Sequence, residues 1–98
     1  MTVLDTRLLN DLKRIFAAYP ALERAVVFGS YAKGTATERS DIDVALCGSA
    51  LNRFVVADIA LSIDDSDIPV DVDLQNYADI KNAALRDHID RVGIQVYP

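Results

Sequence analysis

The sequence predicts a small α/β (α+β) domain in which helices pack on a mixed β-sheet. Apolar runs of strand length alternate along the chain with segments whose apolar residues recur at helical spacing. The chain has 98 residues, of which 51% are hydrophobic, so it has the size of one domain with a modest core. No repeat or low-complexity segment interrupts the alternation. We therefore expect residues 1–98 to form a single layered domain.

The elements follow from local patterns and from residues that end helices and strands. Leucines and other apolar residues recur at helical spacing over residues 4–18, and Pro20 follows this predicted helix. An acidic cluster at residues 64–67 is expected to be an exposed turn. The remaining predicted elements are strands at 25–28, 41–46, 70–74 and 94–97, a helical turn at 30–34, and helices at 51–62 and 78–92, the last with a potential break near Asn82.

The charge balance argues against several classes of function. The chain carries 15 acidic and 10 basic residues, a net charge of −5, whereas proteins that bind nucleic acid without specificity show a basic face. No apolar stretch approaches the ~18 residues of a membrane helix, and the N-terminus lacks the pattern of a signal peptide. The one cysteine, Cys47, excludes an internal disulfide. We therefore expect a cytoplasmic protein that binds neither membranes nor nucleic acid non-specifically.

A glycine and a serine mark the junction between the first predicted strand and the helical turn that follows it. Gly29 follows an apolar strand, and Ser30 begins the helical turn. Glycine allows a sharp turn and the close approach of a ligand, and free N–H groups at the start of a helix suit phosphate. An ordinary turn with an N-cap would give the same pair, so the motif is informative only together with other residues.

Paired aspartates begin one predicted strand and recur in another. Residues i and i+2 of a strand point to the same face, so Asp41 and Asp43 should project side by side. Neighbouring carboxylates repel unless a divalent cation lies between them, although two solvated acids at a strand end are the alternative. In the later strand Asp71 and Asp73 share one face, and either could supply a third ligand.

These residues together resemble a known signature. Residues 28–45 contain Gly29-Ser30, ten intervening residues and Asp41-x-Asp43, which is similar to the motif of the DNA polymerase β-like nucleotidyltransferase superfamily, and of its minimal nucleotidyltransferase (MNT) branch in particular. The segment 67–74 also resembles that branch, where a strand ending in Val-Asp-Leu carries the third acid. The resemblance therefore implies a polymerase β palm-like fold and selects Asp73 over Asp71.

The resemblance also implies a mechanism. Asp41, Asp43 and Asp73 would be both catalytic residues and ligands of two Mg²⁺ ions, while Gly29 and Ser30 would hold a nucleoside triphosphate, ATP by family default. Asp73 would hold or deprotonate the acceptor hydroxyl, and pyrophosphate would leave in line. Lys33 and Arg39 are further candidates for phosphate contacts.

In this branch the domain is typically the antitoxin of a two-gene pair. The resemblance therefore implies a hetero-oligomer with an all-helical HEPN protein from the adjacent gene, often an RNase toxin, which receives AMP on a tyrosine. Nothing in the sequence indicates an acceptor pocket, which is consistent with an acceptor supplied by a partner. Two alternatives remain: a non-catalytic nucleotide-binding subunit that neutralises or assists its partner by complex formation, and nucleotidyl transfer to a small molecule such as an aminoglycoside.

Three other residues are assigned ordinary structural positions. His88, on the last predicted helix, is expected to be solvated or to lie at a helix end, and Tyr31 and Tyr97 are expected to pack in the core.

Overall fold

The computed structural model describes residues 6–37 and 40–98. The start of the first predicted helix, at residues 4 and 5, lies outside the described residues, as does Arg39. The elements in chain order are α1 (Thr6–Phe16), β1 (Arg24–Phe28), α2 (Ser30–Lys33), β2 (Ile42–Cys47), α3 (Arg53–Asp64), β3 (Val72–Asn76), the 3-10 helix η1 (Tyr77–Asp79), α4 (Ala83–Val92) and β4 (Ile94–Tyr97).

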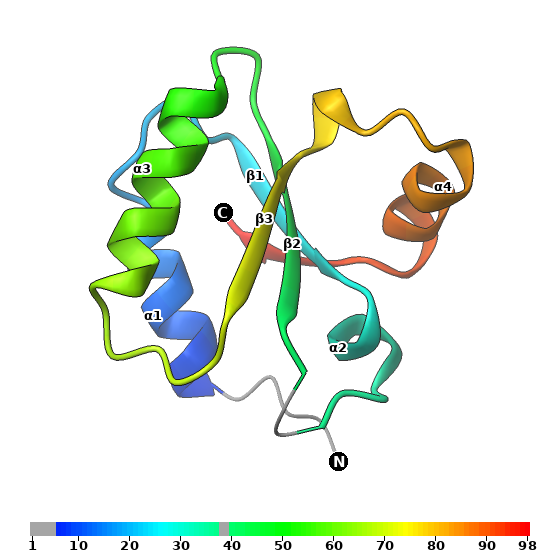
Figure 1. The fold of residues 1–98 in the computed structure, drawn as a ribbon, viewed down its shortest axis with the longest axis horizontal. Coiled ribbons are helices and arrows are strands. Elements are labelled where there is room, and N and C mark those ends of the chain that lie inside the picture. The colour runs from blue at the N-terminus through cyan, green and yellow to red at the C-terminus, as the bar shows by residue number, and fades with distance from the viewer. Residues whose placement is uncertain (1–5, 38–39) are drawn as a thin grey trace.

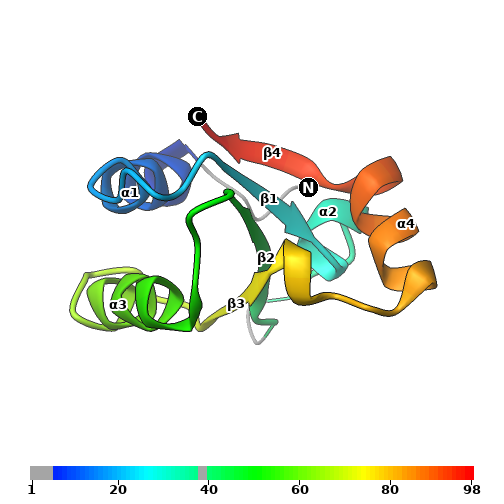
Figure 2. The ribbon, with the colours of Figure 1, turned by 90° about the horizontal axis from the view of Figure 1, so that it is seen from above.

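Four strands form one mixed sheet in the order β3-β2-β1-β4. β1 pairs antiparallel with β2 and with β4, whereas β2 pairs parallel with β3. The predicted mixed sheet with packed helices is therefore confirmed. Figures 1 and 2 show α1 and α3 on one face of the sheet and α4 on the other, with α2 at the end of β1.

Alternating side chains of the strands divide the core between the two faces. Val44 of β2 faces α1 and α3, together with Leu12 and Ile59 from those helices. Ala45, the next residue of β2, faces the opposite side and packs with Phe28 and with Ile89 of α4. The face covered by α4 has the smaller buried cluster, so more of that face is left for polar residues.

Asparagine caps set the starts of several elements and explain where the predicted bounds were wrong. Asn52 accepts hydrogen bonds from the N–H groups of Phe54 and Val55, so α3 begins at residue 53 rather than 51. Asn76 caps the short η1, and Asn82 accepts from the N–H of Leu85 at the start of α4. The predicted helix over 78–92 is therefore divided, with the break at Asn82 as expected.

Two strand predictions began too early. β2 runs from Ile42 to Cys47 and β3 from Val72 to Asn76, so Asp41 and Asp71 each directly precede a strand. The backbone hydrogen bonding between β2 and β3 nevertheless extends to Asp71, because the N–H of Ile42 donates to the carbonyl of Asp71 at 2.9 Å. α1 ends at Phe16 instead of residue 18. The N–H groups of Ala18 and Tyr19 bond three residues back in place of four.

Candidate active site

The turn from β1 into α2 needs a glycine at residue 29 for two reasons. Gly29 has φ +73° and ψ −145°, a backbone conformation that residues with a Cβ atom rarely adopt. A Cβ atom added at this position would lie 2.5 Å from Oδ2 of Asp43, closer than van der Waals contact allows. The absence of a side chain therefore brings the backbone of the Gly29-Ser30 turn directly against an acidic side chain.

Helix α2 is a single turn that begins with Ser30. The N–H of Lys33 donates to the carbonyl of Gly29 at 3.0 Å, and the N–H of Thr35 donates to the carbonyl of Ser30 at 3.0 Å. Gly34 closes the turn in the left-handed conformation, with φ +75°. So short a helix has little macrodipole, but its first N–H groups lack partners within the helix and are free to bind an anion.

The strand register places two of the three predicted acids side by side. Asp43 of β2 is paired with Asp73 of the parallel strand β3 and lies opposite Phe28 of the antiparallel strand β1. In Figure 1 the starts of β2 and β3 and the turn into α2 lie at the same end of the sheet. Asp43 is half-buried, whereas Asp41 and Asp73 are exposed.

Burial and the charges of the other two acids both act on the Asp43 carboxyl. Burial raises the pKa of the Asp43 carboxyl above its ordinary value, and the negative charges of Asp73 and then Asp41 raise it further. Asp71 is not among the charges that shift this pKa, and the register does not pair it with Asp43. Of the two acids in the later strand region, Asp73 is therefore the one that acts on Asp43.

The acids suit a divalent metal ion in their chemistry. Carboxylate oxygens are the ligands that Mg²⁺ prefers. Among residues 6–37 and 40–98, no three acidic, histidine or cysteine side chains already converge closely enough to hold one ion between them. The sheet fixes the backbone of Asp43 beside Asp73, and the side chains of Asp41 and Asp73 are exposed. In donor chemistry the three carboxylates therefore fit Mg²⁺.

Tyr31 ties α2 to the segment that precedes β2. Its ring is buried, as predicted, and its hydroxyl donates to the carbonyl of Ser40 at 3.4 Å. Burial and the nearby charge of Asp41 raise the pKa of the Tyr31 hydroxyl above its ordinary value. The tyrosine thus stays neutral and holds the two polar segments of the site together. Tyr97 also packs in the core, with its ring edge-on to Phe16.

The expectation that His88 is solvated was wrong. His88 of α4 is half-buried, and its Nε2 atom accepts a hydrogen bond from the N–H of Gly29 at 3.1 Å. The imidazole also lies edge-on to the ring of Phe28, with 6.2 Å between the ring centroids. The partners are 59 residues apart in the chain, so no local pattern could have revealed the contact.

Lys33 and Arg39 are the two basic residues predicted to contact phosphate. Lys33 is exposed in the last turn of α2, near the site but not bonded to its acids in the described part of the chain. Arg39 lies outside the described residues. A phosphate contact by either residue stays a prediction.

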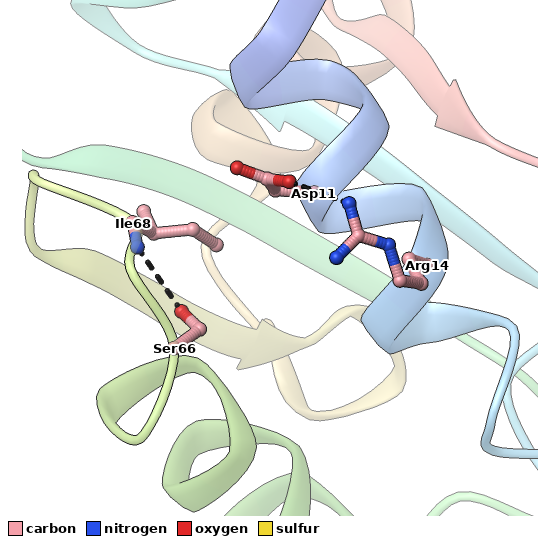
Figure 3. Close-up of polar contacts among 4 residues, drawn as sticks. All are labelled: Asp11, Arg14, Ser66 and Ile68. Carbon is pink, nitrogen blue, oxygen red and sulfur yellow. Dashed lines mark hydrogen bonds and ion pairs between the residues drawn. The ribbon is translucent and has the colours of Figure 1, made fainter.

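A large hollow lies elsewhere, between α1 and the loop after α3. It has a volume of about 730 Å³ and is lined by residues of α1 together with Ser66 and Asp67. Figure 3 shows that Arg14 pairs with Asp11 here, at 2.7 Å, and that Ser66 Oγ accepts from the N–H of Ile68 at 3.2 Å. The hollow lies on the face of the sheet opposite Phe28, so it is not part of the acidic site.

Comparison with known proteins supports the family. A family model described as polymerase beta, nucleotidyltransferase matches residues 10–98. The chain belongs to this nucleotidyltransferase family. The resemblance drawn from Gly29-Ser30 and the paired aspartates is therefore confirmed at the level of the family. No curated protein sequence matches the chain significantly.

Solved structures share the nucleotidyltransferase fold. A toxin–antitoxin structure with AMP-PNP is 27% identical, covers 90% of this chain and 71% of that chain, and has a TM-score of 0.74. Another solved structure is described as that of a minimal nucleotidyltransferase. It is 25% identical over 96% of this chain and 95% of that one, with a TM-score of 0.72. A Shewanella oneidensis complex of a tri-AMPylated HEPN toxin with an MNT antitoxin is 23% identical over 92% and 69%, with a TM-score of 0.68.

The described part of the chain also bears on the membrane prediction. None of the helices among residues 6–37 and 40–98 is long and apolar enough to cross a bilayer.

Proposed function

We propose that this nucleotidyltransferase moves AMP from ATP to a hydroxyl of a partner protein and thereby acts as the antitoxin of a toxin–antitoxin pair. The observation that carries the proposal is the packing of Gly29 against Asp43, with Asp73 paired beside Asp43. This arrangement joins a phosphate-binding turn to a cluster of carboxylates. Neither part alone would distinguish transfer from simple binding.

Each residue has a proposed role in this reaction. The N–H groups of the first turn of α2 and the Ser30 hydroxyl bind the triphosphate. Asp41, Asp43 and Asp73 would hold the Mg²⁺ ions. Bound Mg²⁺ would neutralise charge on the triphosphate and on the departing pyrophosphate. Asp73 holds the acceptor hydroxyl and takes its proton as the oxygen attacks the α-phosphorus. The bond from that phosphorus to the bridging oxygen breaks, and pyrophosphate leaves.

The identity of the acceptor rests on the neighbours. One related structure holds an ATP analogue, and another contains a HEPN toxin that carries three AMP groups beside an MNT antitoxin. A HEPN protein is therefore the proposed acceptor. That it is encoded by the adjacent gene and modified on a tyrosine is what the resemblance to the minimal nucleotidyltransferases implies. Asp41 and Asp73 are exposed, so a hydroxyl presented by another protein can reach them.

A mass measurement on the complex tests this assignment. The chain is purified with the product of the adjacent gene, incubated with Mg²⁺ and ATP, and both proteins are weighed before and after. We expect the partner to gain one or more adenylate groups on tyrosine. Asp73→Asn should abolish the gain, whereas the matched change Asp71→Asn, at an exposed acid that does not face Asp43, should leave it nearly intact.

Other outcomes identify the alternatives. A stable complex that never gains mass, with any of the four triphosphates, would contradict transfer to this partner and favour a non-catalytic binding subunit. Transfer to a small molecule such as an aminoglycoside, without the partner, would support nucleotidyl transfer but contradict the antitoxin role.

A further inference from the structure

The contact between α4 and the Gly29 turn suggests a role for a residue outside the family signature. We propose that His88 is a positioning residue that holds the backbone of Gly29 in the orientation required for nucleotide binding. The proposal rests on the proposed function, because it assumes that the Gly29-Ser30 turn binds the triphosphate. It adds α4 to the elements that build the site.

The hydrogen bond places a specific demand on the imidazole. The N–H of Gly29 is half-buried, and a buried amide proton needs an acceptor. Nε2 of His88 is that acceptor at 3.1 Å, so the imidazole must be neutral with its proton on Nδ1. With its lone pair so engaged, Nε2 is not available to act as a general base. A positioning role therefore fits the geometry better than a catalytic one.

The side chain of His88 is itself held firmly because polar contacts attach α4 to the η1 segment that follows β3. Nη1 of Arg86 donates to the carbonyls of Tyr77 at 3.1 Å and Ile80 at 3.0 Å. The hydroxyl of Tyr77 donates to Asp90 of α4 at 2.7 Å, and Ile89, next to His88, is buried. These contacts fix the helix on both sides of the imidazole.

The Gly29 turn is not rigid by itself and needs outside contacts to keep its shape. Gly29 has no side chain, and the φ of +73° it adopts is one of several that glycine can reach. Its close approach to Oδ2 of Asp43 would be lost if the peptide rotated. The bond to His88 and the edge-on contact of its ring with Phe28 restrict that rotation. The following N–H groups then keep their direction toward the ligand.

Two substitutions at residue 88 separate the hydrogen bond from the bulk of the ring. His88→Gln keeps an acceptor oxygen at a similar reach, whereas His88→Leu keeps volume but offers no acceptor. With Mg²⁺ and AMP-PNP as the probe, we expect His88→Leu to bind about tenfold more weakly. His88→Gln should stay within about threefold of wild type. In the complex with the partner protein, the KM for ATP should rise in His88→Leu while kcat changes less.

A stability control is provided by helix α3, on the other face of the sheet. Ile59→Val loosens the packing of that face and leaves α4 and the bond to Gly29 in place, so it should lower the melting temperature yet leave AMP-PNP affinity unchanged. Nitrogen-15 NMR gives a readout that does not depend on nucleotide. It should show Nδ1 of His88 protonated and Nε2 unprotonated, with the Gly29 amide shift altered in His88→Leu.

The outcomes distinguish failure of this inference from failure of the proposed function. If wild type binds AMP-PNP and His88→Leu binds it equally well, His88 does not position the turn. Equal weakening in His88→Gln and His88→Leu, or a proton on Nε2, would also overturn the hydrogen-bond role. If wild type itself binds no nucleotide while NMR shows the predicted tautomer, the contact is real and the proposed function is wrong.

Discussion

At the scale of single residues, the site depends on how closely a backbone atom and a carboxylate approach each other. Gly29 and Gly34 both have positive φ angles, but only Gly29 lies against another side chain. Sequence patterns can identify the glycine as special. They cannot separate the cost of the backbone conformation from the cost of contact with Asp43, because the second depends on strand pairing.

The two glycines therefore make a matched pair for mutation. Gly34→Ala should cost only the backbone strain of about 1–2 kcal/mol, since nothing lies within 4 Å of the added methyl group. Gly29→Ala should cost more, because the methyl group would also displace the Asp43 carboxylate, and it should abolish AMP-PNP binding. Urea unfolding measures the first effect and calorimetry the second. Equal losses of stability would show that Asp43 does not pack against Gly29.

The raised pKa of Asp43 predicts that its charge lowers stability. The folded state holds the proton of this carboxyl more tightly than the unfolded state, so stability falls as the pH rises from the ordinary pKa through the raised one. Asp43→Asn should therefore raise the melting temperature by a few degrees at pH ~7. The gain should vanish at pH ~3, below the ordinary pKa.

At the scale of elements, helix caps show which helices the site requires. Asn52 caps α3 and Asn82 caps α4, each with its side-chain oxygen accepting from N–H groups of the first turn. Of these two helices, α4 is the one that carries a residue bonded to the Gly29 turn, His88. Comparable losses of helix stability should therefore have different effects on ligand binding.

The cap variants test this difference. Asn52→Ala and Asn82→Ala should each cost about 1 kcal/mol in the free energy of unfolding. Asn82→Ala should also weaken AMP-PNP binding, because the start of α4 would fray and His88 would be held less firmly. Asn52→Ala should bind as wild type does. Equal affinities in the two variants would argue that α4 does not contribute to the site.

The predictability of each element depended on how local its signals are. Val26 and Val27 identify a buried strand, and Gly34 identifies the end of a helical turn, from their immediate neighbours alone. The bounds of β3 were two residues off, because they depend on pairing with β2. The bond from His88 to Gly29 could not be predicted, since it requires the position of α4 on the sheet.

At the scale of the whole molecule, the mixed sheet explains how a spaced motif becomes a site. β1 and β2 run antiparallel, which brings the end of one to the start of the other, and the parallel strand β3 starts beside β2. The α/β class and mixed sheet were predictable from the alternation of elements. The strand order was not predictable in this way, since it depends on contacts between segments far apart in the sequence.

The clustering of like charges on a molecule with net charge −5 predicts a specific response to Mg²⁺. Mg²⁺ should raise the melting temperature of wild type more than NaCl at matched ionic strength, because binding to the folded state adds to simple screening. The double variant Asp41→Asn, Asp43→Asn should respond equally to both salts. A wild type that does not distinguish the salts would contradict the assignment of these acids as metal ligands.

The most direct test of the central claim follows the two ends of the triphosphate separately. The chain and its partner protein are incubated with Mg²⁺ and with ATP labelled at either the α- or the γ-phosphate. Nucleotidyl transfer predicts that the α-label becomes bound to protein, that the γ-label leaves in pyrophosphate, and that Asp43→Asn prevents both. Protein-bound γ-label would show phosphoryl transfer instead, and retention of both labels in intact ATP would contradict catalysis by this site.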